Sequence, residues 1–458
     1  MGTLTHEYYQ QNRQKFLEGL KNLLRIPSIS TLPEHKPDIR RAVEFLAKEL
    51  REMGMKGVEI IEGKPSQQPL LYAEWLGAPG KPTLLLYGHY DVQPPDPVEE
   101  WVSPPFEPTV RNDNIYARGA VDDKGQLYLL VKAVEGFLKA EGKLPINIKF
   151  LIEGEEETGG EHIAAYTAAQ PERLKADAAL VCDTEMFAPE LPTITTGLRG
   201  LVYTELEARG AAHDLHSGMY GGAAPNPIQG LAEILAGLKG RDGKVRIPGF
   251  YKRVKKPARK ELEAWKRLPF NEKEFLKKEI GGTALVGERG ISVLERLWAR
   301  PTLEVHGIRG GFTSEGAKTV IPAVATAKVS MRLVPDMDPK EVIRQYTAFV
   351  KKLTPKGITS TVRVLSSAPA SVVSTDSRWI AAAAEAMEQV FHKKTVYMRS
   401  GGSIPIVGEF QDHLGIPSVM MGFGLPDDHL HAPNEKFHLP NFYRGIDAVA
   451  RYFELLGQ

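Results

Sequence analysis

The chain has a single cysteine and no apolar run long enough to cross a membrane. Cys182 therefore cannot take part in an intrachain disulfide framework, and its place in an apolar segment predicts a small buried residue. The amino-terminal segment has no apolar core of the kind found in a secretory signal and is typical of an amphipathic helix. Together these features favour a cytoplasmic protein.

The sequence also lacks an excess of charge of either sign. Its 58 basic and 57 acidic residues leave a formal net charge of +1. This balance gives no reason to expect a nucleic acid or an anionic membrane as a partner. One basic run, 252–260, is followed at once by Glu261 and Glu263, so we interpret it as a solvated helical surface and not as a nucleic-acid site.

The chain alternates between helical and strand-like segments, and its 458 residues are too many for one core. The pattern over residues 1–196 predicts an α/β fold, with a mostly parallel sheet and helices on both faces. Over 197–370 alternating strands flank helices, which is typical of an α+β domain with an antiparallel sheet. The first pattern resumes over 371–458, so we expect the second domain to be inserted into the first.

Four strand-like segments run into residues that can bind a metal ion. These residues are His89 with Asp91, the acidic run at 153–157, Asp183, and His431 in a loop. In open α/β sheets, ligands bind beyond the carboxyl ends of the strands. Imidazoles and carboxylates gathered at such an edge are typical ligands of a divalent ion such as zinc. His89 would bind the metal, and Asp91 would support His89 without binding the metal itself.

Two acidic clusters add to this set. Asp122 and Asp123 precede an expected helix, where one Asp would suffice as a cap, and a carboxylate can bridge two metal ions with its two oxygens. The run at 153–157 holds four carboxylates, which repel one another unless cations hold them or one takes a proton. One Glu could bind a metal while its neighbour acts as a general base, but spacing does not select which.

These residues stand in motifs that resemble a known family. The dinuclear zinc metallopeptidases include carnosinase, cytosolic non-specific dipeptidase, aminoacylase and succinyl-diaminopimelate desuccinylase. Nearly the whole chain is similar to this family, with motifs in the same order: GHYDVQP, ARGAVDDKGQ, EGEEETGG, VCD, TTGLRG, DLHSGMYGG, RSGGSIP and HAPNE. DLHSGMYGG and RSGGSIP most resemble the dipeptidase and carnosinase branch.

The resemblance implies two divalent metal ions per subunit, with zinc expected and manganese or cobalt as alternatives. Their ligands would be His89, Asp122, Glu157, Asp183 and His431, with Asp122 bridging the two ions. Glu156 would be the general base, and Asp91 would orient His89. The resemblance also implies a cis peptide bond between Asp122 and Asp123.

In the inserted domain, the resemblance implies a lid that also forms a homodimer. His216 of one subunit would reach the active site of the other and polarise the scissile carbonyl. Arg332 would bind the terminal carboxylate of the substrate, and Thr319 and Ser403 would help to position the peptide. Three other histidines are expected to be ordinary loop residues: His213, His429 and His438.

We therefore predict a cytoplasmic, homodimeric, zinc-dependent enzyme that hydrolyses short peptides, above all dipeptides. An N-acyl-amino-acid deacylase with the same site is the nearest alternative. A non-catalytic metal-binding protein is a remote one, because all the expected ligands and the base are present.

Overall fold

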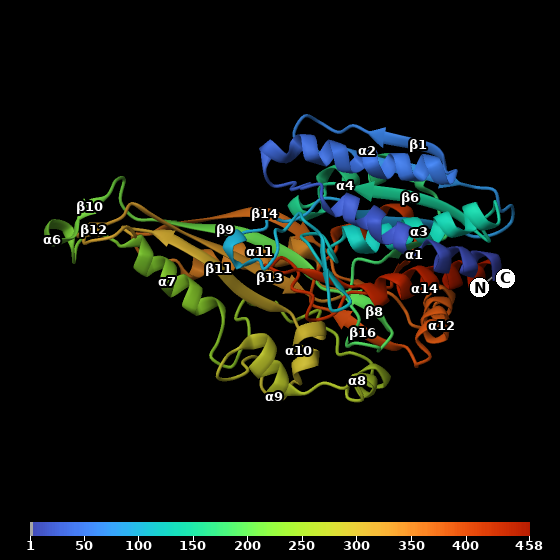
Figure 1. Ribbon diagram of the computed structural model, residues 1–458. Helices are drawn as coiled ribbons and strands as arrows, with labels where there is room; N and C mark the ends of the chain where they lie inside the picture. Colours follow the sequence, from blue (N-terminus) through green and yellow to red (C-terminus); the bar gives the residue numbers. More distant parts are fainter. Residues whose placement is uncertain (1–2) are drawn as a thin grey trace. The chain divides into compact units, whose positions relative to one another are not determined.

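The computed structural model describes residues 3–458 and divides into two compact units (Figure 1). Unit 1 comprises the residues up to Thr196, Val373–Met398 and Pro405–Gln458. Unit 2 comprises Gly197–Val372 and the short segment Arg399–Ile404. Unit 2 therefore interrupts unit 1 in the sequence, and a few residues of the carboxyl-terminal part also belong to unit 2.

A central sheet organises unit 1. Its strands run in the order β1 (Lys56–Ile61), β2 (Leu70–Trp75), β6 (Asn147–Glu153), β3 (Thr83–His89), β7 (Ala178–Val181), β17 (Ser418–Met420) and β8 (Thr193–Leu198). Strand β8 also pairs with two further strands, β15 (Ser371–Val372) and β16 (Val396–Ser400). Strands β6, β3, β7 and β17 are parallel, whereas β1 and β2 are antiparallel to their neighbours. The predicted mostly parallel sheet is confirmed.

Helices cover both faces of this sheet because side chains along a strand alternate in direction. On β3, Leu84 and Leu86 belong to the core that includes helix α3 (Lys124–Ala140), whereas Tyr87 packs against Phe410 of η5 (Phe410–Leu414), with ring centroids 6.1 Å apart. The other helices of unit 1 are α1 (Thr3–Leu24), α2 (Lys36–Met53), α4 (Glu161–Ala169), α5 (Pro171–Leu174), α12 (Arg378–Phe391), α13 (Pro405–Glu409) and α14 (Leu439–Gly457). A small sheet contains β18 (Lys436–His438), β5 (Asn114–Tyr116) and β4 (Thr109–Arg111).

Unit 2 contains an antiparallel sheet, as the alternating pattern predicted. Its order is β11 (Thr302–Gly310), β13 (Val324–Leu333), β9 (Gly200–Arg209) and β14 (Thr359–Ala368). Alternate residues of β9, such as Val202 and Leu206, are buried in a core shared with helices α7 (Pro227–Leu238) and α11 (Pro339–Leu353). The remaining elements are β10 (Leu215–His216), β12 (Val320–Ile321), α6 (Ser217–Tyr220), α8 (Arg259–Trp265), α9 (Glu272–Glu274), η4 (Phe275–Ile280) and α10 (Val293–Ala299).

Two expectations about single features can be checked directly. Cys182 is buried, as its apolar surroundings predicted. None of the helices in the described part of the chain combines the length and the apolar character needed to span a bilayer.

The close packing of α1 on α3 generates a stability prediction. Gly136 of α3 lies against the ring of Tyr9, which is buried and donates its hydroxyl to the carbonyl of Ala133 at 2.6 Å. A methyl group at position 136 would overlap that ring, so Gly136→Ala should lower the free energy of unfolding by about 1–3 kcal/mol. Denaturant unfolding measures the change.

A double-mutant cycle identifies the cause of the loss. If crowding against Tyr9 is responsible, Tyr9→Ala should remove most of the additional cost of Gly136→Ala, since residues in contact give non-additive effects. Strictly additive losses in the two variants would show that the contact with Tyr9 is not the reason.

Candidate metal centre

The candidate metal centre is built where parallel strands of unit 1 end. His89 is the last residue of β3, Asp183 follows β7 by two residues, and Glu157 lies in the short helix η3 (Glu156–Thr158) after β6. Because β3, β6 and β7 are parallel, their carboxyl ends meet at one edge of the sheet. Asp122 lies just before α3, and His431 lies in the loop between β17 and β18. All five predicted ligands thus belong to unit 1.

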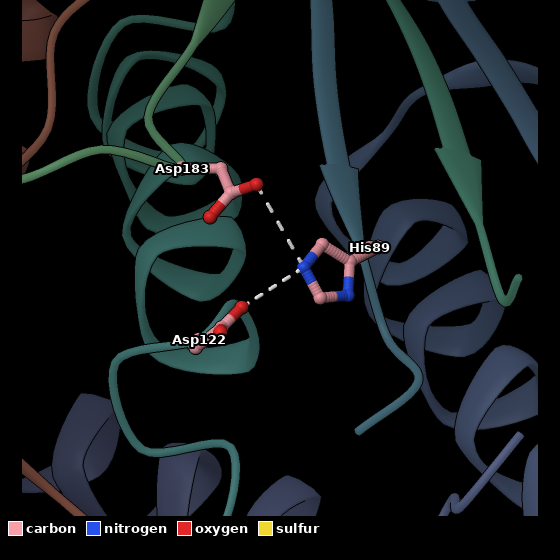
Figure 2. A group of neighbouring side chains, drawn as sticks. All are labelled: His89, Asp122 and Asp183. Carbon is pink, nitrogen blue, oxygen red and sulfur yellow. Dashed lines mark hydrogen bonds and ion pairs between the residues drawn. The ribbon is translucent and has the colours of Figure 1, made fainter. Parts of the chain in front are cut away.

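Asp122 is shared by two groups of ligand atoms. In the first group, shown in Figure 2, Nε2 of His89 lies 3.2 Å from Oδ1 of Asp122 and 3.9 Å from Oδ2 of Asp183. In the second, Nε2 of His431 lies 2.9 Å from Oδ2 of Asp122 and 3.4 Å from Oε2 of Glu157. Within each group the ligand atoms lie within 4.8 Å of one another. Each group offers one imidazole and two carboxylates, and each oxygen of Asp122 faces a different group.

The electrostatics of these residues fit a pair of divalent cations. Burial, reinforced by the charge of Asp122, raises the pKa of Asp183 to about 7. Hydrogen bonds to Asp122 and Glu157 raise the pKa of His431 to about 10. Raised pKa values in both an acid and an imidazole indicate that the negative charge of the cluster is not fully compensated by its surroundings. Divalent cations bound here would supply the missing positive charge, and imidazole with carboxylate is a donor set that suits zinc.

Asp91 holds two parts of the centre together. Its Oδ1 lies 3.3 Å from Nδ1 of His89, on the side of the ring away from Asp122. The same carboxylate accepts hydrogen bonds from the backbone N–H groups of Glu156, at 3.3 Å, and Glu157, at 3.1 Å. A partner on the second ring nitrogen fixes the orientation of a ligating histidine. Asp91 therefore orients the ring of His89 and fixes the backbone at the start of η3.

The glutamates of the run at 153–157 have different environments. Glu153 accepts a hydrogen bond from the hydroxyl of Tyr87 at 2.6 Å. Glu155 accepts from the backbone N–H groups of Gln68, at 2.7 Å, and His162, at 3.1 Å. Both oxygens of Glu155 and one oxygen of Glu153 therefore accept hydrogen bonds within the protein. Glu156 and Glu157 remain, and the spacing alone could not have selected them.

Glu156 is half-buried and directly precedes the ligand Glu157 in the chain. Burial raises the pKa of Glu156 well above its usual range, and the charge of Asp183 raises it further while that of His89 opposes the rise. A carboxyl group with a raised pKa next to a metal centre can exchange a proton with a reacting group near neutral pH.

Two residues near the ligands have roles that sequence reasoning missed. Gln93 donates a hydrogen bond from Nε2 to Oε2 of Glu157 at 2.8 Å. Asp123 accepts one from the backbone N–H of His89 at 3.0 Å and makes no capping bond to α3. Both lie in motifs beside a ligand, which is the signal that could have pointed to them. The peptide bond between Asp122 and Asp123 is cis, as the resemblance implied.

The predicted residues of unit 2 form two pairs. His216 caps α6, and its Nδ1 accepts a hydrogen bond from the backbone N–H of Gly218 at 3.0 Å. Thr319 lies beside it, since its carbonyl accepts from the N–H of Ser217 at 3.0 Å. In the second pair, Nη1 of Arg332 donates to Oγ of Ser403 at 2.8 Å.

Arg332 has features of an anion site. Burial lowers the pKa of its guanidinium, and within residues 3–458 no carboxylate forms an ion pair with it. A half-buried guanidinium with only a hydroxyl partner retains donors for a carboxylate. His213, His429 and His438 belong to neither group of ligand atoms. The expectation of a loop position is wrong for His438, which ends β18 and pairs with Asn114 of β5.

Comparisons with known proteins show what the whole chain is similar to. The family model described as peptidase family M20/M25/M40 matches residues 85–455. A Cys-Gly metallodipeptidase of Candida albicans is 31% identical over 469 aligned residues, covering 98% of this chain and 96% of the relative. The solved structure of human carnosine dipeptidase 1 is 29% identical with a TM-score of 0.88 and covers 100% of this chain and 99% of the other. An M20 family metallo-carboxypeptidase from Sulfolobus solfataricus is 33% identical, also with a TM-score of 0.88, over 96% and 99%.

The shared position of Asp122 predicts how metal content responds to substitution. Protein reloaded with zinc should hold about two ions per chain, as in two-metal hydrolases. Asp122→Ala should lose binding at both groups, whereas His431→Ala should lose it at one, because His89 and Asp183 are unchanged. Mass spectrometry of the native protein and elemental analysis measure the content.

His429 provides the matched control for this experiment. It lies two residues from His431 in the same loop and belongs to neither ligand group. His429→Ala should therefore keep the wild-type zinc content. Retention of both ions by Asp122→Ala would show that the two groups do not share this ligand.

Proposed function

Because the chain belongs to peptidase family M20/M25/M40, we propose that it hydrolyses the peptide bond of dipeptides with a pair of divalent ions. The observation that carries this proposal is the position of Asp122, with one oxygen toward each group of ligand atoms. The relatives named as dipeptidases, which align with nearly the whole chain, support dipeptides as the substrate class.

His89, Asp122 and Asp183 would hold one ion, and Asp122, Glu157 and His431 the other. Ions held there would act as Lewis acids toward a carbonyl group and lower the pKa of water. Zinc suits these ligands best, and manganese or cobalt could replace it according to availability.

Glu156 is proposed as the general base. Its carboxylate would accept the proton of the attacking water and later deliver it to the leaving amine. Two features support this role: its carboxyl interacts electrostatically with His89 and Asp183, and its backbone N–H is fixed by Asp91. Asp91 would act through His89 and Glu156 as a positioning residue.

His216 is proposed to stabilise the oxyanion. Its Nδ1 accepts a hydrogen bond from Gly218, so the neutral ring carries its proton on Nε2. That N–H is therefore a donor, and it would bind the carbonyl oxygen as negative charge develops there. Unit 2 would act as the lid that brings His216 of one subunit to the active site of the other.

The homodimer that this role requires is proposed to form through unit 2. Strand β11 lies at one edge of its sheet and exposes Val305 and Ile308, with Phe312 exposed just beyond the strand. An edge strand with exposed apolar side chains can pair with another chain.

Arg332 and Ser403 are proposed to bind the terminal carboxylate of the substrate, and Thr319 to help position the peptide beside His216. A guanidinium fork matches a carboxylate in shape and charge. This feature fits a dipeptide, and it equally fits an N-acyl amino acid.

A second candidate function is removal of a carboxyl-terminal residue from longer peptides. The observation that favours it is the similarity to the Sulfolobus metallo-carboxypeptidase, at 33% identity over 96% of the chain. The two functions use the same bond cleavage and differ in the length of peptide accepted.

The role of Glu156 is tested by Glu156→Gln. Loss of the proton acceptor should lower kcat for a dipeptide by a factor on the order of 10² to 10⁴ while zinc stays bound. Glu161→Gln is the matched control, because Glu161 is exposed at the start of α4 and belongs to neither group of ligand atoms, so turnover should not change. A Glu156→Gln enzyme that retains zinc and turns over within a few-fold of wild type would rule out this role.

Substrate class is tested with a panel of one dipeptide, its carboxyl-terminal amide, a tripeptide and an N-acetyl amino acid. The free dipeptide should have the highest kcat/KM, and the amide should lose on the order of 10² or more, because the charge partner of Arg332 is missing. Arg332→Met should abolish this discrimination. Arg363→Met, which changes an exposed ion pair with Glu205, should not.

Preference for the tripeptide would favour the carboxypeptidase, and preference for the N-acetyl amino acid would favour a deacylase. Equal discrimination against the amide by wild type and Arg332→Met would place the carboxylate elsewhere.

A further inference from the structure

Glu435 is a buried carboxylate in the loop that carries His431, four residues further along the chain. Its two oxygens accept four hydrogen bonds from one other segment. Oε1 accepts from the backbone N–H groups of Val121, at 3.0 Å, and Asp122, at 3.1 Å. Oε2 accepts from the N–H of Gly119, at 3.0 Å, and from Nη1 of Arg118, at 2.6 Å.

The segment that donates these hydrogen bonds presents the shared ligand. Residues 117–123 connect β5 to α3 and contain no helix or strand of their own. Gly119 has φ +80°, a left-handed conformation that favours glycine, so the segment turns sharply around the carboxylate. One of the N–H groups bound by Glu435 is that of Asp122 itself. A displacement of Glu435 would therefore move the backbone of the residue that both ligand groups share.

The same loop is tied to the segment at several points. The N–H of Ala117 donates to the carbonyl of Glu435 at 3.1 Å, and Lys436 pairs with Tyr116 between β18 and β5. These backbone bonds would suffice to attach the loop. The side chain of Glu435 adds a buried carboxylate directed at the amides that lead to Asp122, and burying a charged group is unfavourable unless it is paired and hydrogen-bonded. A group that is unfavourable to bury and has this placement points to a role in the centre itself.

We propose that Glu435 is a positioning residue for the metal centre, which holds Asp122 in place from the loop of His431. It links the one ligand common to both groups with a ligand of the second group, so that the two groups form as a unit. This inference rests on the proposed function for the identity of the ligands, and not for the substrate.

Glu435→Gln is the direct test. The side chain keeps its shape, but one acceptor oxygen becomes an NH₂ group that faces N–H donors, so at least part of the network is lost. Zinc affinity, measured by competition with a chelating dye on the full-length protein, should fall about 10- to 100-fold, as is common when a group behind a metal ligand is removed. Hydrogen exchange of the amides of Gly119, Val121 and Asp122 should accelerate in the zinc-loaded protein.

Glu288→Gln is the matched control. Glu288 is also a buried glutamate paired with an arginine, since it accepts from Arg300 at 2.9 and 2.7 Å, but it lies in unit 2. This variant should lose stability without a change in zinc affinity. If Glu435→Gln does not fold, Glu435→Asp keeps the charge and retracts it by one methylene group, and should also bind zinc more weakly.

The outcomes separate this inference from the proposed function. Zinc affinity within two-fold of wild type in a folded Glu435 variant would overturn the positioning role, whatever the peptidase activity. Weaker zinc binding in the variant, together with a wild-type protein that cleaves no peptide, would support the positioning role and refute the proposed function.

Discussion

The crowding of carboxylates around Asp122 is the constraint on which the rest of the structure depends. Each oxygen of Asp122 faces an imidazole. Asp183, Glu156 and Glu157 are close enough to interact electrostatically with one another. Such a set of negative charges is unfavourable at the edge of a buried sheet unless cations compensate it. The residues around it are arranged so that the repelling groups stay in place.

Several of these supporting contacts come from main-chain amides and not from other charged side chains. Asp91 accepts from the N–H groups of Glu156 and Glu157, and Asp123 accepts from that of His89. A carboxylate that binds amides fixes a turn of the chain, and the side chain that the turn presents is fixed with it. Backbone hydrogen bonds therefore hold the segments that present the ligands, and close placement of metal ligands requires such support.

Under the proposed function, the two units divide the chemistry between them. Unit 1 contributes the ligand groups and Glu156, each at the end of a strand or the start of a helix. Unit 2 contributes groups suited to a substrate: the Nε2 donor of His216 and the guanidinium of Arg332 with Ser403. Arg399–Ile404 belongs to unit 2 although its neighbours on both sides in the sequence belong to unit 1, so Ser403 lies with Arg332.

The sequence by itself determined the class of fold and the ligand types, because apolar strands and the residues that follow them are local patterns. It also marked the motifs that resemble a peptidase family, now shown by the match to residues 85–455. Spacing left the roles within the acidic run open, and the resemblance implied Glu156 and Glu157. Only the tertiary structure shows what the other two glutamates of the run bind. Glu153 and Glu155 are turned toward Tyr87, Gln68 and His162, partners that come from distant parts of the chain. The contacts of Gln93, Asp123 and Glu435 were hidden for the same reason, since a hydrogen bond between distant segments exists only once the chain has folded.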